Sequence, residues 1–114
     1  MPHFVLDCSE NVLDSHTEQE IIERVHAVAF ATGLFAEANM KVRLNPFKTY
    51  LVGGKRDDFI HVFANIMEGR NTEQKAELSL KVVAALAELF PHISNIAMNV
   101  NDFEKATYRN RSML

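Results

Sequence analysis

The sequence of 114 residues has a single cysteine, Cys8, so the chain can form no internal disulfide. It has no apolar run long enough to span a bilayer, and its N-terminus lacks the basic region and cleavage pattern of a signal peptide. These absences predict a cytoplasmic protein that does not enter a membrane. The formal net charge is −3 and the basic residues are scattered, so no nucleic-acid-binding surface is expected.

The common catalytic motifs are missing as well. There is no Cys-x-x-Cys and no Gly-x-Ser-x-Gly, and the pair Gly53-Gly54 is too short for a phosphate loop. The five histidines show no i,i+4 pair and no spacing typical of metal ligands. The sequence therefore predicts neither a metal site nor a cofactor.

What remains is an ordinary globular composition, with 47% hydrophobic and 24% charged residues. This length fits one domain over residues 1–114. Such a chain buries only roughly two-thirds of its unfolded surface, which leaves little interior for a private pocket. An active site formed between subunits would not require a pocket inside a single chain.

The first third of the chain is predicted to contain a strand and a helix. Residues 3–9 are apolar and favour a strand, whereas the polar residues 10–16 favour a loop. Thr17 and Glu20 have the form of a capping box, and Gly33 should end the helix that follows. Apolar residues recur at helical spacing on one face of this helix, namely Ile21, Val25, Val28, Ala29 and Thr32.

Two further strands are expected around a glycine turn. Residues 40–44 alternate apolar and basic side chains, as a half-buried strand does, and Pro46 should end or bulge this strand. Residues 49–52 continue as extended chain, Gly53-Gly54 form a turn, and residues 59–67 form another strand. The strands on either side of this turn are predicted to be an antiparallel pair.

A second helix and a last strand complete the pattern. The segment 71–74 should open the helix and Pro91 should end it. Its repeating apolar positions are Ala76, Leu80, Val83, Ala87 and Phe90. Residues 95–100 favour a strand, and residues 101–114 predict a short helix or an arm on a neighbouring subunit.

The two halves of the chain resemble each other. Thr-Glu-Gln occurs at residues 17–19 and again at 72–74, and residues 39–45 match 95–101 at nearly the same offset. The fold class is therefore α+β, a tandem βαβ repeat that forms a four-stranded sheet with two helices on one face. Another copy of the chain should cover the bare face, so a symmetric oligomer is expected.

Pro2 is the most distinctive residue. If the initiator methionine is removed, its nitrogen becomes a secondary amine at the chain terminus. Terminal amines titrate low for a base, and apolar surroundings or nearby cations lower their pKa further. A neutral amine near pH 7 serves as a general base, and its conjugate acid as a general acid. The alternative is that Pro2 only favours methionine removal.

Three cations offer sites for an anionic ligand. Arg70 directly precedes the start of the second helix, where free amides favour anions and a guanidinium can bind a carboxylate with two bonds. Lys41 and Arg43 are two residues apart on a strand and so share a face. The alternative for each is an ordinary solvated surface residue.

Together these residues resemble a known family. Met-Pro-His-Phe at the start, the βαβ repeat, the basic strand from Lys41 to Arg43, and Gly69-Arg70 before a capped helix are similar to the tautomerase superfamily. Within it, the resemblance is strongest to the 5-carboxymethyl-2-hydroxymuconate isomerase family, and it spans most of the chain. Lys41 departs from the family, which tends to have an Arg-x-Arg pattern there, and residues 46–58 look short.

The resemblance implies a homotrimer with sites at subunit junctions and no cofactor. It implies Pro2, Arg70 and Lys41 as catalytic residues, with Arg43 binding the substrate, a small 2-hydroxymuconate-type carboxylate from homoprotocatechuate catabolism. Two alternatives stay open: a non-catalytic oligomer that binds a carboxylate or a protein, and a tautomerase for phenylpyruvate or another 2-oxo acid. While Met1 is attached, Pro2 has no basic nitrogen.

Overall fold

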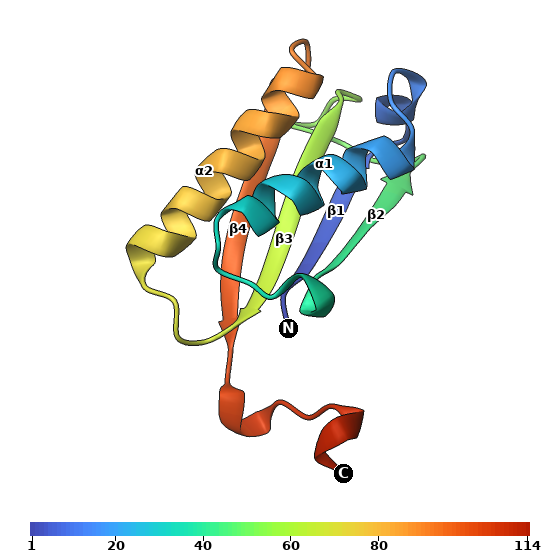
Figure 1. Cartoon of the computed structure of the whole chain (residues 1–114). Coiled ribbons are helices and arrows are strands. Elements are labelled where there is room, and N and C mark those ends of the chain that lie inside the picture. Colours follow the sequence, from blue (N-terminus) through green and yellow to red (C-terminus); the bar gives the residue numbers. More distant parts are fainter.

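The computed structural model describes residues 1–114 and contains a four-stranded sheet with two helices packed on one face (Figure 1). The α+β class and the strand–helix–strand order of each half confirm the prediction. The strands are β1 His3–Ser9, β2 Lys41–Phe47, β3 Phe59–Met67 and β4 Asn95–Phe103, and the helices are α1 Glu18–Ala31 and α2 Thr72–Leu89. Short 3-10 helices cover Glu10–Asp14, Glu37–Asn39, Lys105–Thr107 and Arg111–Met113. None of the helices combines the length and hydrophobicity that a membrane crossing requires.

The strand order is β2-β1-β3-β4, with β1 and β3 antiparallel at the centre. Each helix connects two parallel neighbours, β1 with β2 and β3 with β4. The predicted antiparallel pair across Gly53-Gly54 is wrong, because β2 occupies one edge of β1 and leaves the other edge to β3. Within the turn, Val52 pairs only with Lys55, in an isolated bridge.

Two local predictions around β1 and β2 are also wrong. Pro46 neither ends nor bulges β2, which continues to Phe47 with Pro46 opposite Cys8. Proline is tolerated because β2 is an edge strand, with one side free of ladder hydrogen bonds. The segment 10–16 is not simply a loop, since Glu10–Asp14 form a 3-10 helix that buries Val12.

Both helices begin with a capping box. The Thr17 side chain accepts a hydrogen bond from the backbone N–H of Glu20, and the Glu20 side chain accepts one from the backbone N–H of Thr17. At α2 the cap is Asn71, whose Oδ1 accepts from Gln74 N at 2.8 Å. Thr72 is already the first helical residue, so the matching Thr-Glu-Gln triplets sit one position apart relative to their caps. The two halves therefore repeat the order strand, helix, strand, but the Thr-Glu-Gln triplet does not occupy equivalent positions in the two helices.

We expect Asn71→Ala to lower the free energy of unfolding by about 1 kcal/mol, because an early amide of α2 then loses its acceptor. Urea denaturation followed by circular dichroism measures this. The matched control is Thr72→Ala, which removes a neighbouring polar side chain that accepts no capping bond. Equal losses in the two variants would contradict the assignment of Asn71 as the cap.

The core lies between the sheet and the helices and contains 17 buried residues. Burial alternates along β1 and β3, so Phe4 and Leu6, with Val62 opposite, face the helices. On α2 the buried side chains are Leu78, Val82, Ala85 and Leu86, with Phe90 just after the helix. The predicted face of α2 is wrong apart from Phe90 and the half-buried Val83: Ala76 and Ala87 are exposed, and Leu80 is 70% exposed. The core positions of α2 are instead Leu78, Val82 and Leu86, spaced four apart, together with Ala85.

The opposite face of the sheet, here called the open face, has no helix over it (Figure 1). Its polar side chains bond to one another across the strands: His61 Nε2 lies 2.5 Å from Asn99 Oδ1, and Asn45 donates to Asp7 at 3.2 Å. Phe63 is 37% exposed on this face. The segments after β2 and β4 reach only its ends, where Tyr50 and Tyr108 line hollows.

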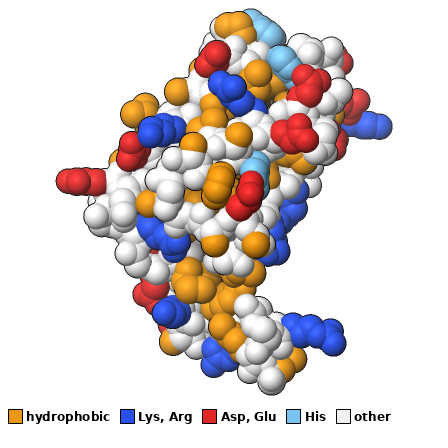
Figure 2. Space-filling model, in the orientation of Figure 1, with side chains coloured by type: hydrophobic (Ala, Val, Ile, Leu, Met, Phe, Trp, Pro, Cys, Tyr) orange, Lys and Arg blue, Asp and Glu red, His pale blue; other side chains and the backbone are white.

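Residues 104–114 extend past the end of β4 and stretch the molecule to 44 Å along one axis against 26 Å along the others. Figure 2 shows this segment standing away from the body, with hydrophobic atoms at the junction and Lys or Arg atoms beyond it. Lys105 N donates to Glu68 Oε2 at 2.7 Å and so ties the start of the segment to the end of β3.

Candidate functional site

The start of the chain is fixed at one end of the sheet. Pro2 is buried, and its carbonyl accepts a hydrogen bond from Lys41 N at 3.1 Å. His3 then enters β1 opposite Lys41 on β2 and Asn65 on β3. The first residues therefore lie where β1 and β2 begin and β3 ends.

Arg70 reaches the same end from the turn between β3 and α2. Gly69 has a φ of +126°, a conformation that side chains disfavour, and it redirects the chain after β3. The Arg70 guanidinium donates to Leu34 O at 2.6 Å and to Met67 O at 3.3 Å. Its Cζ lies 5.0 Å from the centre of the Phe35 ring. These contacts hold the guanidinium in one orientation.

Lys41 and Arg43 project from β2 on the open face, as their spacing predicted, while Val42 and Leu44 pack on the core. Arg43 Nη1 donates to His3 Nδ1 at 3.1 Å, and Lys41 Nζ donates to Asn39 O at 3.4 Å. Each of these cations bonds only to neutral groups.

None of Lys41, Arg43 and Arg70 forms an ion pair with a carboxylate, although the chain is acidic overall. The lysines and arginines that do form ion pairs lie elsewhere, in Lys75–Asp102, Lys81–Glu77 and Arg24–Glu88. A concentration of unpaired cations attracts anions and is typical of a site for an acidic ligand.

The electrostatics of the chain start show that Lys41 and Arg70 act on it. The pKa of the Met1 amino group lies below its ordinary value, first because burial disfavours the charged form, and then because Arg70 and Lys41 repel it. An amine at this position therefore loses its proton more easily than a free chain terminus does.

Cys8 has the opposite character. It is fully buried, and burial raises the pKa of its thiol to about 12. The thiolate form that reacts as a nucleophile is therefore absent at neutral pH.

The structure thus brings Pro2, Lys41 and Arg70 together and places Arg43 beside them on the open face. Sequence reasoning missed His3, Leu34 and Phe35. The position of His3 next to Pro2 was a usable signal, since alternation along a strand puts it on the open face with Lys41. Leu34 and Phe35 gave no signal, because they reach Arg70 only through the tertiary fold.

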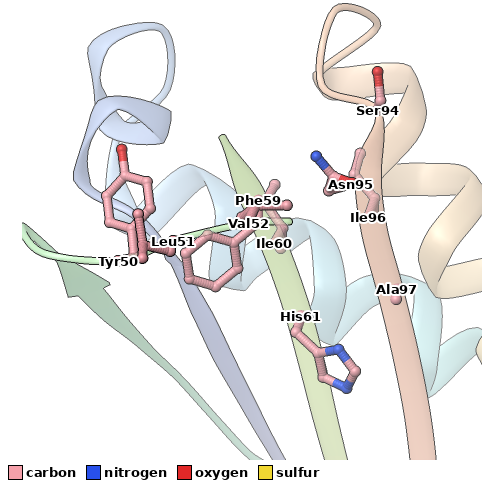
Figure 3. A pocket seen from close by; sticks show the side chains of 10 residues that line it. All are labelled: Tyr50, Leu51, Val52, Phe59, Ile60, His61, Ser94, Asn95, Ile96 and Ala97. Carbon is pink, nitrogen blue, oxygen red and sulfur yellow. The ribbon is translucent and has the colours of Figure 1, made fainter. Parts of the chain in front are cut away.

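The largest hollow, about 490 Å³, lies at the other end of the sheet. Figure 3 shows Tyr50, Phe59 and His61 across from Asn95 and Ala97, near the starts of β3 and β4. Its full lining is Tyr50, Leu51, Val52, Phe59, Ile60, His61, Ser94, Asn95, Ile96 and Ala97. It contains no Lys, Arg, Asp or Glu, so the cations described above define a separate site.

Comparison with known proteins decides the family. A family model described as 5-carboxymethyl-2-hydroxymuconate isomerase matches residues 2–112. The chain belongs to this family. The resemblance read from the sequence is confirmed, and the chain is a member of a family of isomerases.

Individual proteins are similar to this chain as well. The 5-carboxymethyl-2-hydroxymuconate Delta-isomerase of Escherichia coli is 27% identical over 79 residues, which are 68% of this chain and 63% of that protein. The aligned stretch thus spans less than two-thirds of the Escherichia coli enzyme. A 5-carboxymethyl-2-hydroxymuconate isomerase from Deinococcus radiodurans R1 has a TM-score of 0.83 at 21% identity, covering 96% of this chain and 88% of its own. A fused 4-OT, solved as a symmetric trimer, has a TM-score of 0.81 at 15% identity and covers 98% of this chain and 95% of its own. These two structures share the fold.

Proposed function

We propose that this chain, once Met1 is removed, is a cofactor-independent tautomerase in which the Pro2 nitrogen carries the proton. One observation carries the proposal: the chain start lies in surroundings that lower the pKa of a terminal amine, with Arg70 and Lys41 acting on it. The Pro2 nitrogen is one residue further along the same backbone. A neutral secondary amine there is a general base at neutral pH.

In the proposed reaction, the Pro2 nitrogen takes the proton from the 2-hydroxyl oxygen of a conjugated dienol. The oxygen forms a carbonyl with C2, and the displaced electron pair moves along the conjugated chain to a distant carbon. Pro2 then returns the proton to that carbon and is neutral again. The negative charge of the dienolate develops beside cations, which stabilise it more than they stabilise the neutral dienol.

The substrate class follows from the same charges. A guanidinium such as that of Arg70 can bind a planar carboxylate with two bonds, and Lys41 supplies a second positive charge without a fork. We propose a 2-hydroxymuconate-type dicarboxylate or tricarboxylate, with 5-carboxymethyl-2-hydroxymuconate from homoprotocatechuate catabolism as the first compound to test. The family supports this choice. The reaction is proposed to take place in the cytoplasm.

The active form is proposed to be a homotrimer. The open face has exposed apolar and polar side chains that no element of the chain covers, and one protein of the same fold is a symmetric trimer. Light scattering is expected to give three times the 12.9 kDa mass of the chain. A monomer at micromolar concentration would contradict this proposal.

One alternative function is kept because of Met1. While Met1 is attached, the Pro2 nitrogen is an amide without basicity, yet Lys41, Arg43 and Arg70 remain free to bind a carboxylate. Such a chain would be a carboxylate-binding oligomer without catalysis.

The test combines intact-mass spectrometry with an ultraviolet assay. The expected result is a mass without Met1 and conversion of 5-carboxymethyl-2-hydroxymuconate. A panel with phenylpyruvate and other 2-oxo acids identifies a different tautomerase activity. A processed chain that converts no compound of the panel would overturn the isomerase proposal in favour of the binding function.

A further inference from the structure

The 490 Å³ hollow occupies the same place in the second βαβ unit as the chain-start site does in the first. Asn95 stands opposite the first residue of β3, as Lys41 stands opposite the first residue of β1. Two residues further along, Ala97 on β4 corresponds to Arg43 on β2. The second unit therefore has a hollow at this position, with an amide and a methyl group where the first unit has two cations.

The polar side chains of this hollow have two acceptors without a donor in the chain. Asn99 Oδ1 can only accept, so His61 Nε2 carries the hydrogen of the neutral ring and Nδ1 is left as an acceptor. The Asn95 Nδ2 group donates to Asp57 Oδ2 and to Asp58 O, each at 3.2 Å, so its Oδ1 is free to accept. A ligand that offers a hydroxyl donor satisfies such a group.

The charges near the hollow disfavour a charged ligand of either sign. The lining itself has no Lys, Arg, Asp or Glu. At its edge, the Asp57 carboxylate is bonded to Asn95, whereas the Arg56 guanidinium lies over the Tyr50 ring, with Cζ 4.7 Å from the ring centre. A charge buried without a partner is costly, so the hollow favours an uncharged compound.

Aromatic rings form one wall of the hollow (Figure 3). The ring centres of Tyr50 and Phe59 are 5.4 Å apart and their planes are inclined by 60°. Ile60 and Ile96 add further apolar surface to the lining. A flat aromatic ligand packs favourably against such rings, and the volume of the hollow lies within the range of small-molecule sites.

We infer that this hollow is a second binding site, for an uncharged compound with an aromatic ring and a hydroxyl donor, that is, a simple phenol. The phenol ring packs against Tyr50 and Phe59, and its hydroxyl donates to His61 Nδ1, with Asn95 Oδ1 as the second acceptor. The site is separate from the proposed catalytic residues, which lie at the other end of the sheet. A trimer contact centred on Phe63, midway along β3, leaves both ends of the open face accessible.

The test uses 4-methylphenol and 4-methylanisole, which differ only in a methyl group that replaces the hydroxyl hydrogen. In a nuclear magnetic resonance titration of the full chain, 4-methylphenol is expected to bind about three to ten times more tightly. The backbone amide signals of residues 50–52, 59–61 and 94–97 should shift, while those of residues 41–43 and 70 should not. The anion 4-methylbenzoate should leave the signals of the hollow unchanged.

Two variants examine the contacts. Ala97→Leu places a larger side chain in the hollow and should abolish the shifts that 4-methylphenol causes there. His61→Phe keeps a planar ring without Nδ1 and should lose most of the preference for the phenol over its methyl ether. The matched control is Ala87→Leu, which makes the same change at an exposed position of α2 and should bind like the unmodified chain.

Three results would overturn the inference. The first is equal binding of 4-methylphenol and 4-methylanisole by the unmodified chain. The second is the absence of shifts at the hollow with either compound, which is the result expected if a neighbouring copy of the chain fills it. The third is unchanged binding of 4-methylphenol by Ala97→Leu. None of these results bears on the isomerase proposal, which the ultraviolet assay tests separately.

Discussion

A chain that retains Met1 is expected to convert its substrate roughly 10²–10⁴ times more slowly than the processed chain. The reason is that the Pro2 nitrogen is then an amide and can neither take nor return a proton. Two preparations of the same sequence, distinguished by intact mass, are compared by initial rate in the ultraviolet assay. Processed Pro2→Ala is a useful third sample, because it loses the proline but keeps an amine, and its loss should be smaller than that caused by Met1.

The pH dependence of the processed chain gives a separate check. The neutral amine is the active base, so the rate should fall as the pH drops through its pKa. Burial and the charges of Arg70 and Lys41 place that pKa below the ordinary value for a terminal amine. Lys41→Gln removes one of the repelling charges, so the acid limb of the rate profile should move to higher pH. A limb that stays in place or moves to lower pH would contradict the role of Lys41.

Arg70→Ala is expected to lower kcat/KM by roughly 10²–10³, the range found when a donor that stabilises developing negative charge is removed. Leu34 O, Met67 O and the Phe35 ring position this guanidinium, so its contribution is preorganised. Arg70→Lys should recover only part of the activity, because an ammonium cannot bind a carboxylate with two parallel bonds.

Arg56→Ala is a closely matched control for that measurement. Arg56 also donates to a backbone carbonyl, Lys48 O at 2.8 Å, and its Cζ lies 4.7 Å from the ring centre of Tyr50. It belongs to the loop between β2 and β3, away from the chain start. The variant loses the same kinds of contact without touching the candidate site. An equal loss of activity in Arg56→Ala would mean that Arg70 acts through stability rather than on the substrate.

The sequence predicted those elements whose signals are local. The apolar runs at residues 3–9 and 59–67 predicted β1 and β3, and the structure has both strands with these bounds. The caps at Thr17 and Asn71 also follow from residues three apart. Burial on α2 could not be predicted this way, since alanines such as Ala76 and Ala87 extend apolar character around the helix. Packing against the sheet alone determines which of the apolar residues of α2 are buried.

The arrangement of the strands and the site depends on long-range contacts. No local pattern indicates that β2 pairs with one edge of β1 and β3 with the other. For this reason the glycine turn at residues 53–54 predicts an antiparallel pair of neighbouring strands that the sheet does not contain. Pro2, Lys41 and Arg70 were recognisable as separate residues with useful chemistry. Their proximity, and the contribution of Phe35, arise only when the two βαβ units meet along the centre of the sheet.

Because two βαβ units are joined in one polypeptide, only one of the two equivalent strands, β1 and β3, begins at the N-terminus. β1 begins at the start of the chain, whereas β3 is preceded by Asp58, whose carboxylate accepts a hydrogen bond from Ser9 Oγ at 2.9 Å. If a terminal amine carries the proton, the second unit has no counterpart of that amine. The reaction then places no constraint on the residues at the start of β3. Tolerance to mutation should then be unequal between the halves: strict around the beginning of β1, and limited around the beginning of β3 by folding and ligand binding rather than by catalysis.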